Sequence, residues 1–139
     1  MGKNSKLPRI TEIAASKITE KINSGEYSAK LSRQQYLKHI EGTPQYEQYK
    51  NSRHAKGQPP QSVLELTEQE AQQMILDKAG TGIVKIDENG NMLPIESITA
   101  DKIIGKIWSG EKFIKTSKAR IYYGKNSSHI IPIGGMNYD

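Results

Sequence analysis

The segment Ile83-Val84-Lys85-Ile86-Asp87-Glu88-Asn89-Gly90-Asn91 lies where this sequence changes from helical to extended periodicity. Residues 83–86 have the composition of a β-strand, and Asn89-Gly90 accepts the positive φ angles that a tight hairpin turn requires. A strand, a turn and a return strand over residues 92–95 are therefore predicted.

Extended segments continue from this hairpin to the end of the chain. Four further strands are predicted, at residues 103–108, 112–116, 120–124 and 129–133. Upstream, helical patterns occupy residues 10–22, 32–40, 44–55 and 67–79, with a short strand candidate at 62–66. Helices followed by an antiparallel sheet meander are typical of an α+β fold rather than a doubly wound one.

Helix start signals support this division. Ser32 with Gln35, and Thr67 with Glu70, have the spacing of capping boxes. Pro44 suits the first position of a helix, because a proline there loses no hydrogen bond. The first helix precedes these denser motifs and carries one apolar stripe, formed by Ile10, Ile13, Ala14, Ile18 and Ile22. We therefore expect a basic amphipathic helix or linker over residues 1–31 and a separate domain over residues 32–139.

The composition excludes several classes of protein. The 139 residues include no cysteine, which excludes a disulfide framework, a thiolate zinc site and a cysteine nucleophile. No run of eighteen apolar residues is present, and no apolar run follows the charged N-terminus, so neither a membrane span nor a secretory signal is expected. A hydrophobic content of 35% supports one domain with a modest core.

The charges are segregated along the chain. The net charge is +5, but residues 62–101 hold eight acidic and two basic residues, whereas residues 102–139 hold two acidic and seven basic ones. Such a distribution can produce a basic face that attracts polyanions such as nucleic acid. Charge alone is equally typical of solvated helix and strand faces.

The C-terminal region combines basic residues with a histidine. The stretch from Lys115 to Arg120 is strongly basic, and the following hairpin leads into a strand that begins at His129. Lysine and arginine can hold a phosphate, and histidine can exchange a proton near neutral pH. This combination suits chemistry on a phosphodiester.

Five ordered blocks of the sequence resemble the polymorphic toxin type fifty family. They are Arg33-Gln34-Gln35-Tyr36-Leu37-Lys38-His39-Ile40-Glu41-Gly42-Thr43, Gln61-Ser62-Val63-Leu64, Lys78-Ala79-Gly80-Thr81-Gly82, Ile103-Ile104-Gly105-Lys106 and Ile121-Tyr122-Tyr123-Gly124-Lys125-Asn126-Ser127-Ser128-His129-Ile130-Ile131-Pro132. Members of that family occur at the C-termini of bacterial polymorphic toxins and phage head-morphogenesis proteins. The resemblance covers residues 31–133 and implies a ribonuclease of the barnase, EndoU, colicin and RelE group.

The resemblance implies a catalytic pair. The histidine of its Gln-x-x-x-x-His-Ile-x-Gly-Thr block is His39, and the histidine of its last block is His129. The chain departs from the family pattern at Gly124 and Ser128, where serine and glycine are usual.

Metal-independent RNA cleavage needs one group to remove the 2′-hydroxyl proton and another to protonate the leaving 5′-oxygen. Two histidines can divide these roles. A cation must also stabilise the charge on phosphorus, and the basic candidates along the sheet are Lys106, Lys115 and Arg120. Further candidates for substrate binding are the hydroxyl groups of Ser62, Thr116 and Tyr122, the last of which could also stack on a base. No metal site or other cofactor is expected, because the histidines lack metal-ligand spacing.

Each residue also has a purely structural interpretation. His39 lies at the edge of an apolar helical face and His129 begins a half-apolar strand, so either could be a packed histidine. The basic strand residues could form the solvent side of an amphipathic edge. His54 most simply complements the C-terminal end of its helix.

Three functions therefore remain open. The favoured one is an endoribonuclease toxin that acts in a bacterial cytoplasm, leaves 2′,3′-cyclic phosphate ends and is covered by an acidic immunity protein. The second is a non-catalytic nucleic-acid-binding module, and the third is a phage head accessory protein. Each is compatible with a chain that forms a module of a larger phage or secreted protein.

Overall fold

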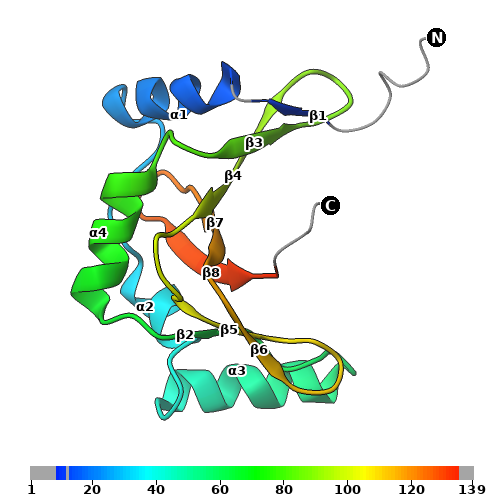
Figure 1. Cartoon of the computed structure of the whole chain (residues 1–139). Coiled ribbons are helices and arrows are strands. Elements are labelled where there is room, and N and C mark those ends of the chain that lie inside the picture. The colour runs from blue at the N-terminus through cyan, green and yellow to red at the C-terminus, as the bar shows by residue number, and fades with distance from the viewer. Residues whose placement is uncertain (1–8, 12, 135–139) are drawn as a thin grey trace, which may run out of the picture.

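Two antiparallel sheets and four helices make up the described part of the chain, residues 9–11 and 13–134 of a computed structural model (Figure 1). The helices are α1 (Ile13–Asn23), α2 (Arg33–Leu37), α3 (Pro44–Ala55) and α4 (Glu68–Lys78). The strands are β1 (Arg9–Thr11), β2 (Val63–Leu64), β3 (Ile83–Ile86), β4 (Met92–Thr99), β5 (Gly105–Trp108), β6 (Phe113–Thr116), β7 (Lys118–Tyr122) and β8 (His129–Ile133). The predicted α+β class is confirmed.

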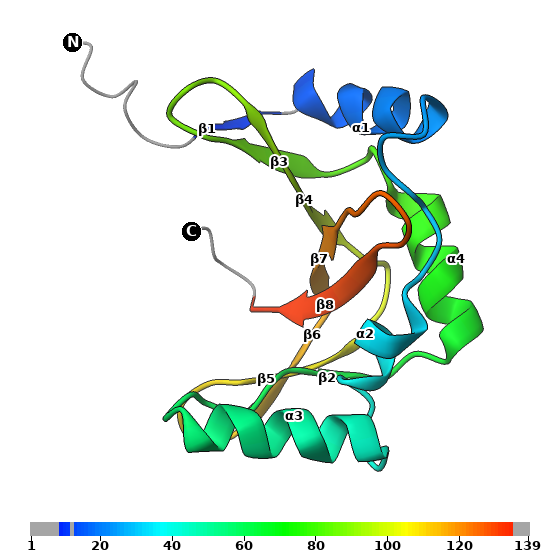
Figure 2. The same ribbon diagram turned by 180° about the vertical axis from the view of Figure 1, so that it is seen from behind.

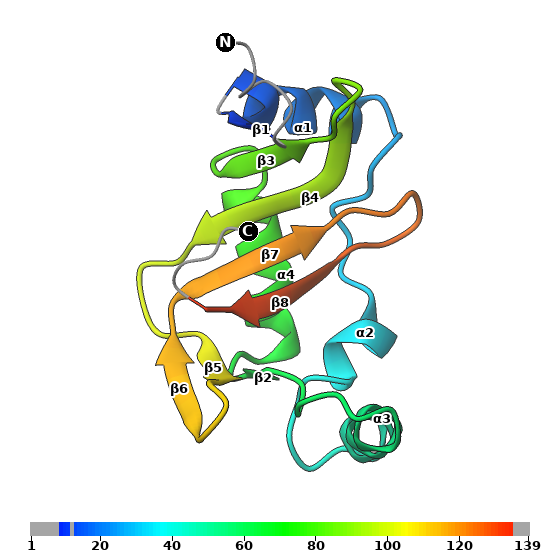
Figure 3. The same cartoon turned by 90° about the vertical axis from the view of Figure 1, so that its right-hand side faces the viewer.

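The larger sheet has the strand order β1-β3-β4-β7-β8. Because side chains alternate along a strand, its two faces differ in character. One face carries the buried residues Val84, Ile98, Ala119, Ile121 and Ile130, which form one core with Ala71 and Ile75 of α4. The other face carries the alternate, half-buried residues of β7 and β8, and it is turned toward the viewer in Figure 3, with α4 behind the strands.

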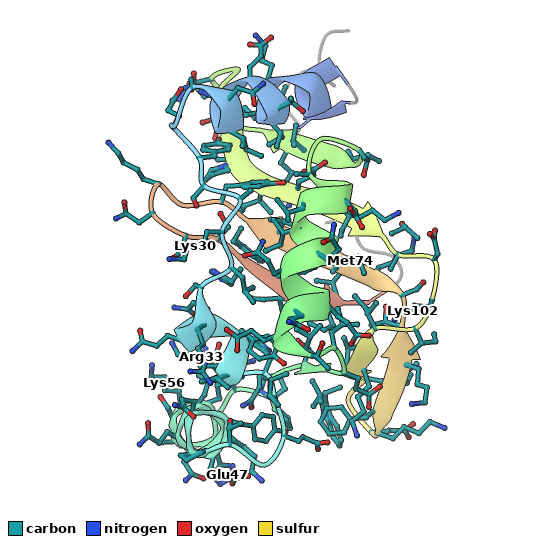
Figure 4. All side chains as sticks on the ribbon, turned by 90° about the vertical axis from the view of Figure 1, so that its left-hand side faces the viewer. Lys30, Arg33, Glu47, Lys56, Met74 and Lys102 are labelled. Atoms are coloured by element: carbon teal, nitrogen blue, oxygen red, sulfur yellow. The ribbon has the colours of Figure 1, made fainter. Side chains whose placement is uncertain are left out.

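Helix α4 is tied to both sides of the molecule. Its Gln72 side chain donates to the Ala29 carbonyl and accepts from the Leu31 amide, both at 2.8 Å. On the other side Glu70 forms an ion pair with Lys102 at 3.7 Å. Figure 4 shows this covered side, with Lys30 and Lys102 on opposite flanks of the helix. The helix therefore fixes residues 29–31 against the sheet.

The smaller sheet has the order β2-β5-β6. Because residue 105 is a glycine, β5 can lie close to both β2 and β8. A Cβ atom at this position would overlap the Val63 carbonyl oxygen of β2 and lie 3.0 Å from the Pro132 ring of β8, in the larger sheet. The predicted single meander is therefore wrong in one respect. The strands β5 and β6 leave the larger sheet and pair with β2 instead, so the chain returns to it only at β7.

The N-terminal prediction also needs correction. Residues 9–11 form β1, which pairs with β3 in register Ile10 opposite Lys85, so the helix begins only at Ile13. Pairing with an available sheet edge overrides the weak helical pattern at Ile10. The side chains of Ile10, Ile13 and Ala14 lie outside the described part, as do residues 1–8. Ile18 of the stripe is fully buried in the common core, and the domain boundary near residue 31 stays a prediction.

Local signals place the other helices correctly. Thr67 and Glu70 form the complete capping box, with Thr67 Oγ1 accepting from the Glu70 amide at 3.1 Å and the Glu70 carboxylate accepting from the Thr67 amide at 2.9 Å. Ser32 Oγ accepts from the Gln35 amide at 3.3 Å. Pro44 takes the first position of α3, as expected. The helix ends that position the candidate site are thus encoded locally.

One carboxylate lies inside the core. Glu96 of β4 is fully buried and accepts hydrogen bonds from the Gly80 amide at 3.0 Å, the Gly82 amide at 2.6 Å and the Tyr123 hydroxyl at 2.7 Å. Burial, and then the Glu96 charge, raise the pKa of the Tyr123 phenol, which keeps it a donor. Glu96 therefore joins the α4–β3 connection to the centre of the sheet.

Candidate active site

His129 opens β8 on the uncovered face of the larger sheet. It pairs directly with Tyr122 of β7, and the two rings stack with their centroids 5.2 Å apart and an interplanar angle of 11°. Burial, and then the charge of Lys38, lower the pKa of His129. The ring is therefore held in one orientation and favours its neutral form in the free protein.

His39 follows α2 and is 5% exposed. Its backbone carbonyl accepts from the Leu64 amide of β2 at 2.8 Å, and its Nδ1 lies 2.8 Å from the Ser62 carbonyl oxygen. A carbonyl can only accept, so Nδ1 carries the proton and Nε2 is the basic nitrogen of the neutral ring. The Ser62 hydroxyl is farther from Nδ1, at 3.4 Å. Ser62 thus contacts the histidine mainly through its backbone.

Backbone pairing brings the two histidines into one region. The extended segment before α2 runs beside the β7–β8 connection: the Ser32 amide donates to the Ser128 carbonyl at 2.7 Å, and the Ser128 amide donates to the Lys30 carbonyl at 2.8 Å. Helix α2 packs on both β8 and α3 (Figure 2). The pKa of His39 is lowered first by burial, an effect that the Ser62 hydrogen bond opposes, and further by the charge of His129. The two imidazoles are therefore electrostatic neighbours.

Two cations near the histidines escaped the sequence analysis. Lys38 Nζ lies 5.4 Å from the centroid of the Tyr49 ring, and the Arg53 guanidinium carbon lies 5.5 Å from it. The His39 ring meets the same Tyr49 ring edge-on at 5.8 Å. Arg53 also lowers the pKa of His39, as Lys38 does. The spacing of Tyr49 and Arg53 by four residues on α3, together with Lys38 next to His39, was the available signal.

Three of the sequence-predicted residues belong to the smaller sheet and have other partners. Lys106 pairs with Glu41 at 3.5 Å and lies over the Phe113 ring at 5.3 Å, and Lys115 pairs with Glu65 at 3.7 Å. Thr116 is buried, and its hydroxyl donates to the Ile133 carbonyl at 2.7 Å. Because β5 and β6 pair with β2, their side chains follow a different sheet from His129. Lys106 nevertheless lies opposite Val63, next to Ser62, and its partner Glu41 is two residues from His39. The roles of these three residues therefore stay predictions.

Arg120 and Tyr122 do share a face with His129. They alternate with the buried residues of β7, and Arg120 lies opposite Ser97 of β4 and Ile131 of β8. Arg120 lines a shallow depression of about 40 Å³ with Ile83, Lys85, Ile95 and Ser97. Tyr122 has one ring face occupied by His129, so it positions this histidine. The uncovered face is thus basic and hydroxyl-bearing beside the histidine.

The third histidine, His54, is exposed in the last turn of α3. It lines a cavity of about 480 Å³ between α3 and β6, with Tyr46, Lys50 and Phe113 among its neighbours. This position fits the interpretation that it complements the C-terminal end of its helix.

The lowered pKa values predict that acid destabilises the protein. An imidazole whose folded pKa lies below its unfolded value of about 6.5 binds more protons when unfolded, so the free energy of unfolding falls as the pH drops below that value. We expect denaturant titrations to give a lower free energy of unfolding at pH 5 than at pH 7.5. The variant His39→Gln should lose part of this difference, which separates the imidazole from titrating carboxylates. An equal pH dependence in wild type and variant would contradict a neutral, buried His39.

The described residues, 9–11 and 13–134, also bear on metal binding and membrane insertion. No group of three or more carboxylate or imidazole side chains is arranged there as a set of metal ligands. No helix in this part of the chain has the length and apolar character needed to cross a membrane.

Comparison with known proteins gives one match. The bacterial toxin 50 (Ntox50) family matches residues 31–132, which include α2, both sheets apart from β1, and both candidate histidines. No curated protein and no solved structure matches the chain. The match covers most of the sequence and agrees with the resemblance over residues 31–132. The chain therefore belongs to the bacterial toxin 50 family.

Proposed function

We propose that this toxin-family chain is a metal-independent endoribonuclease in which His39 and His129 act as general base and general acid. The observation that carries the proposal is that the backbone pairing of the segment before α2 with the β7–β8 connection, and the packing of α2 on β8, bring the buried His39 and the half-buried His129 into one region with Lys38 and Arg53. Perturbed titratable groups gathered with cations are typical of sites that handle a phosphodiester.

The fixed tautomer of His39 suits the role of base. Its Nδ1 proton is engaged by the Ser62 carbonyl, so Nε2 can accept the proton of a ribose 2′-hydroxyl. The 2′-oxygen then forms a bond to phosphorus while the bond between phosphorus and the 5′-oxygen breaks. The products are a 2′,3′-cyclic phosphate and a chain with a 5′-hydroxyl.

His129 supplies the proton that the leaving 5′-oxygen needs. Burial and the Lys38 charge disfavour its protonated form in the free protein. A bound phosphate is negatively charged and opposes both effects, which raises the pKa of His129 when the substrate is present. Tyr122, stacked on this ring, keeps it oriented toward the uncovered face of the sheet, where Arg120 can contact the RNA backbone.

The experiment is incubation of the purified chain with total cellular RNA and with a defined oligoribonucleotide, in the presence of EDTA. We expect internal cleavage with 2′,3′-cyclic phosphate and 5′-hydroxyl ends. Cleavage that EDTA abolishes would contradict the metal-independent mechanism. Salt-sensitive RNA binding without cleavage would instead favour the non-catalytic binding module.

The partner and the site of action belong to the same proposal. A ribonuclease toxin acts where RNA is, so we place its action in a bacterial cytoplasm. A cell that makes it needs protection, and an acidic immunity protein would complement the basic residues around His129. Expression should be tolerated with that neighbouring partner or with His129→Ala. Stable association with a capsid or portal protein and no toxicity would favour the phage accessory alternative.

A further inference from the structure

We infer that Lys38 and Arg53, gathered around the Tyr49 ring, form the binding site for the scissile phosphate group. This inference deepens the proposed function and rests on it for the identity of the ligand. It adds two residues that the family resemblance did not single out to Lys106, Lys115 and Arg120, the stabilising cations that the sequence suggested.

The first argument is geometric. Lys38 Nζ and the Arg53 guanidinium are each within 5.5 Å of the Tyr49 centroid, and the same ring meets His39 edge-on. Arg53 is further held by donation from Nε to the Pro59 carbonyl at 2.6 Å and from Nη1 to the Tyr49 hydroxyl at 3.3 Å. Arg53 is thus held against the Tyr49 ring that contacts His39, and Lys38 lies near the same ring.

The second argument concerns charge compensation. Seven ion pairs are formed within residues 9–11 and 13–134, and they engage Lys21, Arg33, Lys50, Lys78, Lys102, Lys106 and Lys115. Neither Lys38 nor Arg53 takes part in any of them. Both side chains are partly buried, where an uncompensated charge is less well solvated than at an open surface. An anion bound between them would supply the missing compensation.

The electrostatics of the histidines agree with this location. The positive charge of Lys38 lowers the pKa of both His39 and His129. In the proposed mechanism one histidine serves each side of the phosphorus, so the phosphate must lie between the two rings. A cation that acts on both imidazoles is therefore placed to contact that phosphate. Arg53 influences His39 in the same way.

The two side chains have complementary chemistry toward a phosphate. Lysine is a compact point charge, whereas arginine presents several N–H donors in a plane. With Nε and Nη1 engaged by Pro59 and Tyr49, Arg53 retains Nη2 as a donor toward the ligand. Lys38 would then stabilise the charge that develops on the non-bridging oxygens as the 2′-oxygen attacks.

The test compares Lys38→Met with Lys102→Met, an exposed lysine that is paired with Glu70 of α4. Removing one group that stabilises transition-state charge lowers kcat by about 10²- to 10³-fold. We expect a loss of that size in Lys38→Met, partial recovery in Lys38→Arg and a change below about threefold in Lys102→Met. Arg53→Met should lower kcat/KM as well, with thermal unfolding used to confirm that the fold survives.

A second readout does not depend on cleavage. Inorganic phosphate should shift the imidazole NMR signals of His39 and His129 in the wild type and in Lys102→Met, but not in the double variant Lys38→Met/Arg53→Met. Without phosphate, Lys38→Met should raise the pKa of both histidines. Phosphate binding that persists in the folded double variant would overturn the inference.

The outcomes separate this inference from the proposed function. If the wild type cleaves RNA and the histidine variants do not, while Lys38→Met cleaves like the wild type, only the phosphate site is wrong. If the wild type does not cleave RNA at all, the proposed function fails, and the phosphate titration still decides whether the two cations bind an anion.

Discussion

RNA cleavage should fall by about 10²- to 10⁴-fold in His39→Ala and by a similar factor in His129→Ala, since each positioned acid or base contributes a factor of this size. The reason is that each ring would move one proton of the same transesterification. The measurement is kcat/KM on a defined oligoribonucleotide near pH 6.5. Because the two rings act on one reaction, the double variant should lose little more than the more damaging single variant.

The matched control is His54→Ala. His54 is the third histidine of the chain, is exposed on α3 and makes none of the contacts that join His39 to Ser62 or His129 to Tyr122. The His54→Ala variant should cleave RNA like the wild type. His39 is buried, so the unfolding transition of His39→Ala must be measured too, and His39→Gln is the less disruptive replacement. Persistent cleavage by the folded double histidine variant would end the ribonuclease assignment.

The free energy of unfolding should fall most when the buried Glu96 is replaced. Replacement by alanine removes the acceptor of three hydrogen bonds and leaves the Gly80 and Gly82 amides and the Tyr123 hydroxyl buried without partners. Each such group costs about 1–3 kcal/mol, and we expect the free energy of unfolding to fall by about 3–5 kcal/mol in Glu96→Ala. Urea titration followed by far-UV circular dichroism measures this loss.

Three further variants test this explanation. Glu96→Gln keeps the shape but turns one acceptor into a donor that faces an amide, so it should be destabilised less than Glu96→Ala and more than Tyr123→Phe, which removes one hydrogen bond. Glu88→Ala, at an exposed position in the β3–β4 turn, should change the stability by less than about 0.5 kcal/mol. A Glu96→Ala protein as stable as Glu88→Ala would show that the buried carboxylate is not a structural anchor.

Local sequence patterns predicted the helices and strands that have strong signals of their own. The capping box at Thr67 and the proline at position 44 placed α4 and α3, and the strand predicted at residues 129–133 coincides with β8. The pattern at Ile10 failed because the edge of β3 was available for pairing, which no property of residues 9–11 announces. The position of Glu96 inside the core was equally hidden, since its partners come from segments 14–27 residues away.

The candidate site also combines residues that the sequence suggested with residues that only the structure reveals. Lys106 and Lys115 looked suitable because they are basic residues of predicted strands, yet β5 and β6 pair with β2 and their lysines pair with Glu41 and Glu65. No pattern singled out Lys38 or Arg53, because their shared position beside the Tyr49 ring depends on how α2 and α3 pack.

The sequence by itself determined the α+β class, the caps of α3 and α4 and the family, and it proposed the two candidate histidines, because all of these are written in residues close together in the chain or in blocks of fixed order. Only the tertiary structure showed that Lys38 and Arg53 lie near the Tyr49 ring that contacts His39, and which nitrogen of His39 is basic. Those features depend on strand pairing and on contacts across more than 20 residues, such as that of His39 with Ser62. Short-range propensity acts over a few residues, whereas such pairings are chosen by the burial of the whole core.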